Sequence, residues 1–171
     1  MIPIKQPPMP DTRPDPVQPA DPAALALVAQ LRASARTAAL AVIDPTDGSP
    51  GISRIALAPG PDGAPLTLIS ALSAHHAALC AHPACALMLG EVAEKGDPLT
   101  HPRLMLKARA TFVAPDDPTR PALRDHWLAL HPKARLYIDF SDFSFVRFTL
   151  TSGLLNAGFA RAHRLSAEDL A

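Results

Sequence analysis

Short apolar segments separated by clusters of turn-forming residues are the feature that most limits the folds open to this chain. Residues 37–43 run into Asp44-Pro45-Thr46-Asp47-Gly48, and residues 51–58 run into Pro59-Gly60-Pro61-Asp62-Gly63. Asp, Pro and Gly favour tight turns, and turns of this length join neighbouring antiparallel strands. Because residues 65–70 form a third such segment, the sequence predicts an antiparallel meander.

Three more segments have the length and apolar character of strands. They are residues 84–89, 103–113 and 143–155, and helices are predicted over residues 22–34, over residues 74–81 and in the segment that ends near Leu130. A chain of 171 residues is long enough to bury an ordinary core without metal or disulfide support. Because closure removes exposed sheet edges, six antiparallel strands in one domain favour a barrel. We therefore expect a mainly β (α+β) fold, a six-stranded antiparallel barrel with flanking helices.

The N-terminal 20 residues differ in composition from the rest of the chain. They contain seven prolines, which remove amide donors and suit neither a helix nor a central strand. Residues 1–20 are therefore predicted to be an extended arm, disordered or laid on a partner. Asp21 and Pro22 fit the N-cap and first position of a helix, so the folded domain is expected to span residues 21–171.

Charge and hydropathy narrow the class of protein. Sixteen Lys and Arg balance sixteen Asp and Glu, which argues against a nucleic-acid binder because such proteins carry a basic excess. No apolar run reaches the length of about 18 residues that crosses a membrane, and no signal-peptide core is present, so a cytoplasmic protein is expected. Cys80 and Cys85 fit no zinc-site spacing and are interpreted as small buried residues, and no metal site is expected.

An anion site is predicted where the meander meets the helix over residues 74–81. If the turn centres on Pro61 and Asp62, Arg54 lies opposite Ile69 or Ser70, close to the start of that helix. Helix N-terminal amides and an arginine fork favour a phosphate, so we expect such a site to contain Arg54, Ser70, Ser73 and His75. The plainer alternative is a surface arginine beside a serine that caps the helix.

Several segments in this order resemble one known family. They are Arg54-Ile55-Ala56-Leu57, residues 68–75, Arg103-Leu104-x-Leu106-Lys107-Ala108, Phe140-Ser141-Asp142-Phe143 and residues 156–162. The first three resemble the pyridoxamine 5′-phosphate oxidase-like, FMN-binding split-barrel family, and the last two resemble its haem-iron-utilisation subgroup. The resemblance implies that the barrel is a split barrel. Where flavin-binding relatives often carry Arg-Lys, this chain has Ala74 and His75.

The resemblance also implies a cofactor, a partner and site residues. It implies a homodimer with two FMN sites at the interface, and the apolar strands at residues 84–89 and 143–150 agree with a buried interface. The cofactor-binding residues it implies are Arg54, Ser70, Ser73, His75, Arg103 reaching in from the partner subunit, and Arg161. The expected function is a flavoprotein oxidoreductase whose small-molecule substrate and catalytic residues are unknown. The alternatives are a haem-binding or haem-degrading protein, with His163 as the histidine placed best for haem, and a cofactor-free binding module.

Overall fold

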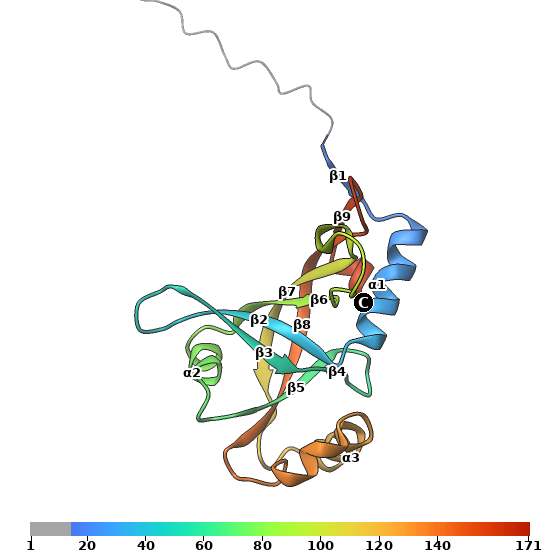
Figure 1. Ribbon diagram of the computed structural model, residues 1–171. Helices are drawn as coiled ribbons and strands as arrows, with labels where there is room; N and C mark the ends of the chain where they lie inside the picture. The colour runs from blue at the N-terminus through green and yellow to red at the C-terminus, as the bar shows by residue number, and fades with distance from the viewer. Residues whose placement is uncertain (1–14) are drawn as a thin grey trace, which may run out of the picture.

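The computed structural model describes residues 15–171 and has the expected mainly β, α+β architecture (Figure 1). Its helices are α1 (Pro22–Ser34), α2 (Ala74–Ala81) and α3 (Arg120–Leu130), with short 3-10 turns at Pro98–Thr100, Pro132–Leu136 and Glu168–Leu170. Its strands are β1 (Val17–Pro19), β2 (Thr37–Ile43), β3 (Pro50–Ala56), β4 (Ala58–Pro59), β5 (Pro65–Ser70), β6 (Ala84–Leu89), β7 (Arg103–Phe112), β8 (Phe143–Asn156) and β9 (Ala162–Leu165). All six expected strands are present, and the other three are short additions.

The strands form one curved sheet in the order β1-β9-β8-β7-β6-β2-β3, and β5 pairs with both β4 and β8. Every pairing is antiparallel except that of β1 with β9. The long strand β8 connects the two ends of the fold, because its first residues pair with β5 and its last residues pair with β9. The prediction of an antiparallel split barrel with flanking helices is confirmed.

The expected pairing of β3 with β5 is wrong. The turn that follows β4 does join antiparallel residues, with Ala58 opposite Leu66, but the chain leaves the β3 direction before that point. The amide of Leu57 donates to the carbonyl of Arg36, which holds the end of β3 beside the start of β2. Arg54 therefore lies opposite Ala39 of β2 rather than opposite Ile69 or Ser70. Strand β5 is buried along almost its whole length, and its main partner is β8.

Two apolar clusters stabilise the fold. The first fills the barrel and is covered by α1, whose N-cap Asp21 accepts a hydrogen bond from the amide of Ala24 at 2.7 Å. The second lies under α3, where Leu123 and Trp127 are buried as the helical spacing predicted. Trp127 stacks on His131 with ring centroids 4.3 Å apart, which fixes the short turn after α3 against the barrel.

The N-terminal arm enters the sheet before its predicted end. Most of the arm lies outside the described residues, but Val17–Pro19 pair in parallel with β9 at the sheet edge, as a proline-containing strand allows. Asp15 and Arg164 form an ion pair of 3.2 Å beside this strand. This part of the arm therefore lies on its own chain, and the sheet begins before the predicted domain start at Asp21. Within residues 15–171, no helix has the length and apolarity needed to cross a membrane.

Candidate functional site

The predicted anion site contains a carboxylate of the chain itself. The Ser70 hydroxyl at the end of β5 donates to Oδ2 of Asp142 at 2.5 Å, and the amide of Leu72 donates to the Ser70 hydroxyl at 3.1 Å. The amide of Ala71 donates to the backbone carbonyl of Asp142 at 2.7 Å, so both chain segments are fixed at this point. A negative group thus occupies the hydroxyl that was expected to hold a phosphate.

The start of α2 also differs from a phosphate cradle. A serine was expected to cap this helix, but the side chain of Ser73 makes no capping hydrogen bond. Its hydroxyl donates instead to the carbonyl of Ser70 at 2.7 Å. His75 is half-buried, and its pKa is lowered because burial disfavours the charged imidazolium and because His76 lies next to it. The side chain of His75 is therefore a neutral imidazole at neutral pH and adds no positive charge to the site.

Within residues 15–171, none of the three arginines of the predicted site forms a hydrogen bond with Ser70. Arg54 is exposed on β3, and Arg103, the first residue of β7, donates to the carbonyl of Leu99 at 2.8 Å. Arg103 pairs with Asn156 at the end of β8, next to the loop that contains Arg161. Ser70 pairs with Phe143 at the start of the same strand. Thirteen steps of strand separate these two partners, about 40 Å of backbone, so Arg103 and Ser70 of one chain lie at opposite ends of β8.

The histidines differ in whether their ring nitrogens are hydrogen-bonded within the chain or remain available to a ligand. The ring nitrogens of His101, His126, His131 and His163 each lie within hydrogen-bond distance of a backbone carbonyl. His163, the histidine predicted to lie nearest haem, is only 8% exposed, and its Nε2 is buried without a partner in the described structure. His76 packs edge-on against Phe112 at 4.9 Å and contacts the Cys80 sulfur.

His75 and His82 remain, and their ring nitrogens have no hydrogen-bond partner within residues 15–171. His82 is exposed, whereas His75 is half-buried. Cys80 is exposed, contrary to the prediction that it is buried, and Cys85 is partly buried. The described part of the chain holds no group of three or more His, Cys, Asp or Glu arranged to bind a metal ion.

The residues present do not fit a flavin phosphate at Ser70. A serine hydroxyl has a single proton to donate, and both Ser70 and Ser73 already donate theirs within the chain. A phosphate would also meet the carboxylate of Asp142 without a compensating cation on α2. The residues fit a haem iron better, because iron takes a neutral imidazole as its ligand and His75 supplies one.

Sequence reasoning missed the role of Asp142. It lies 72 residues after Ser70, and nothing in its local sequence marks it as a partner of that hydroxyl. The motif that contains it, Phe140-Ser141-Asp142-Phe143, points to a family rather than to a contact. No local sequence pattern therefore predicts the contact between Ser70 and Asp142.

Comparison with known proteins identifies relatives of this fold. No family model matches the chain. It is 37% identical over 101 residues, 59% of its length, to the chloroplastic non-canonical heme oxygenase HOZ of Arabidopsis thaliana. A heme binding protein from Mycobacterium smegmatis is 26% identical over 88% of this chain, with a TM-score of 0.76. A protein related to general stress protein 26, of the pyridoxinephosphate oxidase family, from Clostridium acetobutylicum superposes over 89% of this chain and 100% of its own, with a TM-score of 0.66 at 17% identity.

The chain is shorter than its haem-related relatives. It spans 30% of the Arabidopsis protein and 61% of the mycobacterial one. The Clostridium protein shares the fold alone, because its sequence identity is low. Together with the order of strands and helices, these likenesses confirm the resemblance found in the sequence. The chain therefore has the split-barrel fold of the pyridoxamine 5′-phosphate oxidase-like family, and several of the proteins that it resembles carry names that refer to haem.

Proposed function

We propose that this protein binds haem and that His75 is the ligand of the iron. The observation that carries the proposal is the state of the His75 side chain, a half-buried, neutral imidazole whose nitrogens have no partner in the described structure. Burial lowers the pKa of this imidazole, so a larger fraction of it is neutral and its lone pair is available to a metal. Haem, when bound there, would supply a redox-active iron, and the protein would supply the ligand and the surrounding surface.

Haem is favoured over FMN because of Asp142. The carboxylate of Asp142 on the Ser70 hydroxyl opposes a phosphate in the position where the family resemblance would place that of FMN. The names of the Arabidopsis and mycobacterial relatives point in the same direction. Haem degradation is a second candidate, and the 37% identity to a non-canonical heme oxygenase over more than half of the chain favours it.

The protein is proposed to act as a homodimer. Arg103 and Arg161 lie at the far end of β8 from Ser70 and α2, so a single chain cannot bring them to His75. In a dimer the arginines of one protomer could face the α2 of its partner and pair with the carboxylates of a haem. This arrangement keeps the predicted cofactor site at the interface between subunits.

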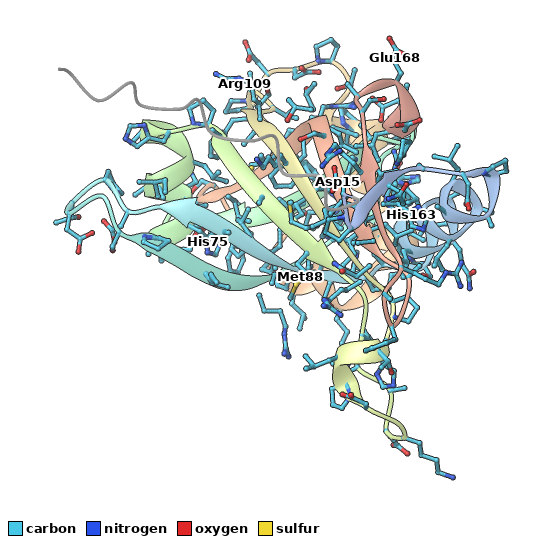
Figure 2. All side chains as sticks on the ribbon, turned by 90° about the horizontal axis from the view of Figure 1, so that it is seen from above. Asp15, His75, Met88, Arg109, His163 and Glu168 are labelled. Carbon is cyan, nitrogen blue, oxygen red and sulfur yellow. The ribbon has the colours of Figure 1, made fainter. Side chains whose placement is uncertain are left out.

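One sheet surface is suited to such an interface. Five residues are cross-strand neighbours on one face, which we call the outer face: Ala39 and Ala41 of β2, Ala86 and Met88 of β6, and Met105 of β7. Met88 is labelled in Figure 2. Their sequence neighbours Leu40, Leu87, Leu104 and Leu106 point into the core and are fully buried. Met88 is 49% exposed, and small alanines beside it leave room for a second sheet. Arg54, opposite Ala39, and Lys107, opposite Ala86, lie on the same face, so two cations border this strip of small and apolar side chains.

Titration of the full chain with hemin tests the haem proposal. The parent is expected to develop a Soret band with saturable binding, and the H75A variant is expected to lose the shift that marks imidazole ligation. The control is H82A, which removes an exposed imidazole eight residues beyond the start of α2 and should bind as the parent does. An H75A spectrum equal to that of the parent would remove His75 as the ligand, and a parent that binds FMN but not hemin would overturn the proposal.

The second candidate and the dimer have separate readouts. If the protein degrades haem, the complex supplied with oxygen and a reductant should lose its Soret band and release carbon monoxide, whereas a persistent band would leave binding as the whole function. Light scattering should show twice 18.1 kDa for the parent and 18.1 kDa for A86R. A122R adds the same charge to an exposed position of α3 and should remain dimeric. A parent of 18.1 kDa at micromolar concentration would contradict the dimer.

A further inference from the structure

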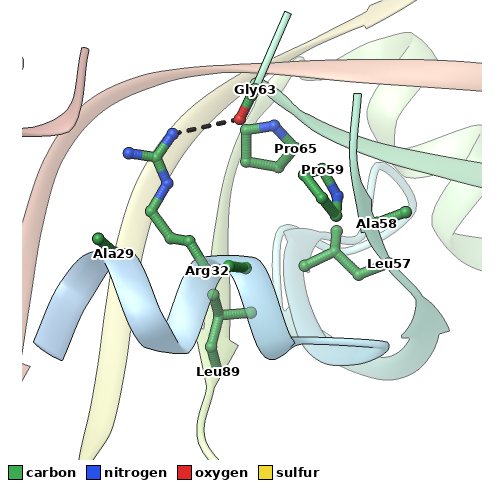
Figure 3. Close-up of a pocket in the computed structure, with 9 residues that line it drawn as sticks. Ala29, Arg32, Leu57, Ala58, Pro59, Gly63, Pro65 and Leu89 are labelled. Carbon is green, nitrogen blue, oxygen red and sulfur yellow. Dashed lines mark hydrogen bonds between the residues drawn. The ribbon is translucent and has the colours of Figure 1, made fainter. Parts of the chain in front are cut away.

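A hollow beneath α1 lies apart from the proposed haem site. It has a volume of about 250 Å³ and opens between α1, the segment around β4 and the turn before β5 (Figure 3). Leu57, Ala58 and Leu89 form a buried apolar floor, and Pro59 and Pro65 form one wall. On the opposite wall α1 presents Ala29 and Ala33, which are one helical turn apart. Because both are alanines, no side chain of the helix fills the space.

Among the described residues that line this hollow, the one charged group is the guanidinium of Arg32. It donates to the carbonyl of Leu170 at 2.8 Å and to the carbonyl of Gly63 at 3.3 Å, and the second of these bonds is drawn in Figure 3. Arg32 is half-buried, and burial lowers its pKa. Carbonyl oxygens satisfy two of its N–H groups but do not neutralise its charge. The described structure contains no ion pair between Arg32 and a carboxylate.

Arg147, which lies nearby, differs from Arg32 because its charge is paired with a carboxylate. Its guanidinium lies 2.6 Å from a carboxylate oxygen of Asp62. Arg32 and Arg147 both line an adjoining hollow of about 470 Å³, so the head group of Arg32 stands at the boundary between two open spaces. Within residues 15–171 the Arg32 charge is thus partly desolvated and has no ion-pair partner, so it is open to an incoming anion.

We propose that this hollow binds a small organic monocarboxylate, with the carboxylate on Arg32 and a compact apolar group against Leu57 and Leu89. A guanidinium fork matches a carboxylate in geometry and charge, and the buried floor offers no polar side chain to any other ligand group. The volume lies just below the range of about 300–1,000 Å³ typical of sites for drug-sized ligands. The hollow therefore suits a ligand of the size of benzoate or hexanoate.

Calorimetric titration of the full chain with sodium benzoate and sodium hexanoate tests this proposal. Both should bind saturably, whereas benzyl alcohol and hexanol, which lack the charge, and acetate, which lacks the apolar group, should not. R32M keeps the length of the side chain and removes its charge. Loss of a charge-assisted pair should weaken binding of both carboxylates roughly 10- to 100-fold.

Two further variants keep the test decisive. A33L fills the hollow from α1 without altering any charge and should also abolish binding, so the proposal remains testable if R32M does not fold. The control is R36M, because Arg36 is exposed on the loop that follows the same helix and donates only to carbonyls. Binding that is equal in the parent, R32M and A33L, or alcohols that bind as well as the carboxylates, would overturn the proposal. None of these outcomes depends on haem, because hemin binding is measured separately.

Discussion

Replacement of Asp142 by Asn should raise the affinity of the protein for FMN. Asp142 accepts a hydrogen bond from the Ser70 hydroxyl at 2.5 Å, so a phosphate at Ser70 would lie close to this carboxylate. Two unit charges about 4 Å apart interact by roughly 4 kcal/mol at the effective dielectric of a protein surface and by roughly 1 kcal/mol in water. Asp142 is half-exposed, so we take about 1–2 kcal/mol, which corresponds to an affinity gain of roughly 5- to 30-fold.

The D142N variant removes the charge of Asp142 and leaves the local structure in place. An asparagine retains a carbonyl oxygen that can accept the Ser70 hydrogen bond, so the end of β5 should stay in place. Quenching of flavin fluorescence measures the affinity for FMN and for riboflavin, which lacks the phosphate. Only the FMN affinity should rise. D116N removes the same formal charge from an exposed loop and should change neither affinity.

Two results would refute this reasoning. If D142N and the parent bind FMN equally, the Asp142 carboxylate does not oppose the binding of a phosphate at Ser70. If riboflavin gains as much affinity as FMN, the effect comes from repacking near the ring rather than from the phosphate.

Three further predictions concern the glycines, the thiols and the core. Gly90 has a φ of +110°, and a Cβ there would lie 2.4 Å from a backbone carbonyl oxygen, so G90A should lower the free energy of unfolding by about 3 kcal/mol or more. Gly48 has a φ of +75° but lies in open space, so G48A should lower it by only about 1–2 kcal/mol. Chemical denaturation measures both values. Burial raises the pKa of Cys85 to about 11, so iodoacetamide at pH 8 should label exposed Cys80 in the native protein and leave Cys85 unmodified. Mass spectrometry of the peptides measures the labelling, and equal labelling of the two cysteines would contradict this prediction. Trp127 is fully buried with an indole N–H that has no acceptor in the described structure, so W127F should destabilise the fold far less than W127A, for which thermal unfolding should show a loss of about 3–5 kcal/mol.

Local sequence patterns were sufficient to locate most elements of the fold. Turn clusters around residues 44–48 and 59–63 separate segments that do form strands, because Asp, Pro and Gly act on the backbone of their own turn. Asp21 caps α1 as predicted, and Leu123 and Trp127 face the core, since N-capping and helical spacing both depend on neighbours within a few residues.

The partners of the strands were decided by the tertiary structure. The sequence predicts that β3 pairs with β5, because consecutive strands usually do, but burial of β5 on both faces needs a long partner, and β8 fills that role. A period of two residues shows which side chains share a face and says nothing about which strand lies alongside. The pairing also places Arg54 opposite Ala39 rather than at Ser70.

The chemistry of the candidate site was likewise decided by contacts between distant residues. Ser73 does bond to Ser70, as their short spacing allows, but Asp142 reaches Ser70 only because β5 pairs with the start of β8. The hollow at Arg32 forms for a similar reason, since α1 crosses the turn before β5 and leaves two alanines above an apolar floor. Local preferences determine where strands, turns and helix caps begin, whereas burial and closure of long loops determine which charges and hydroxyls meet.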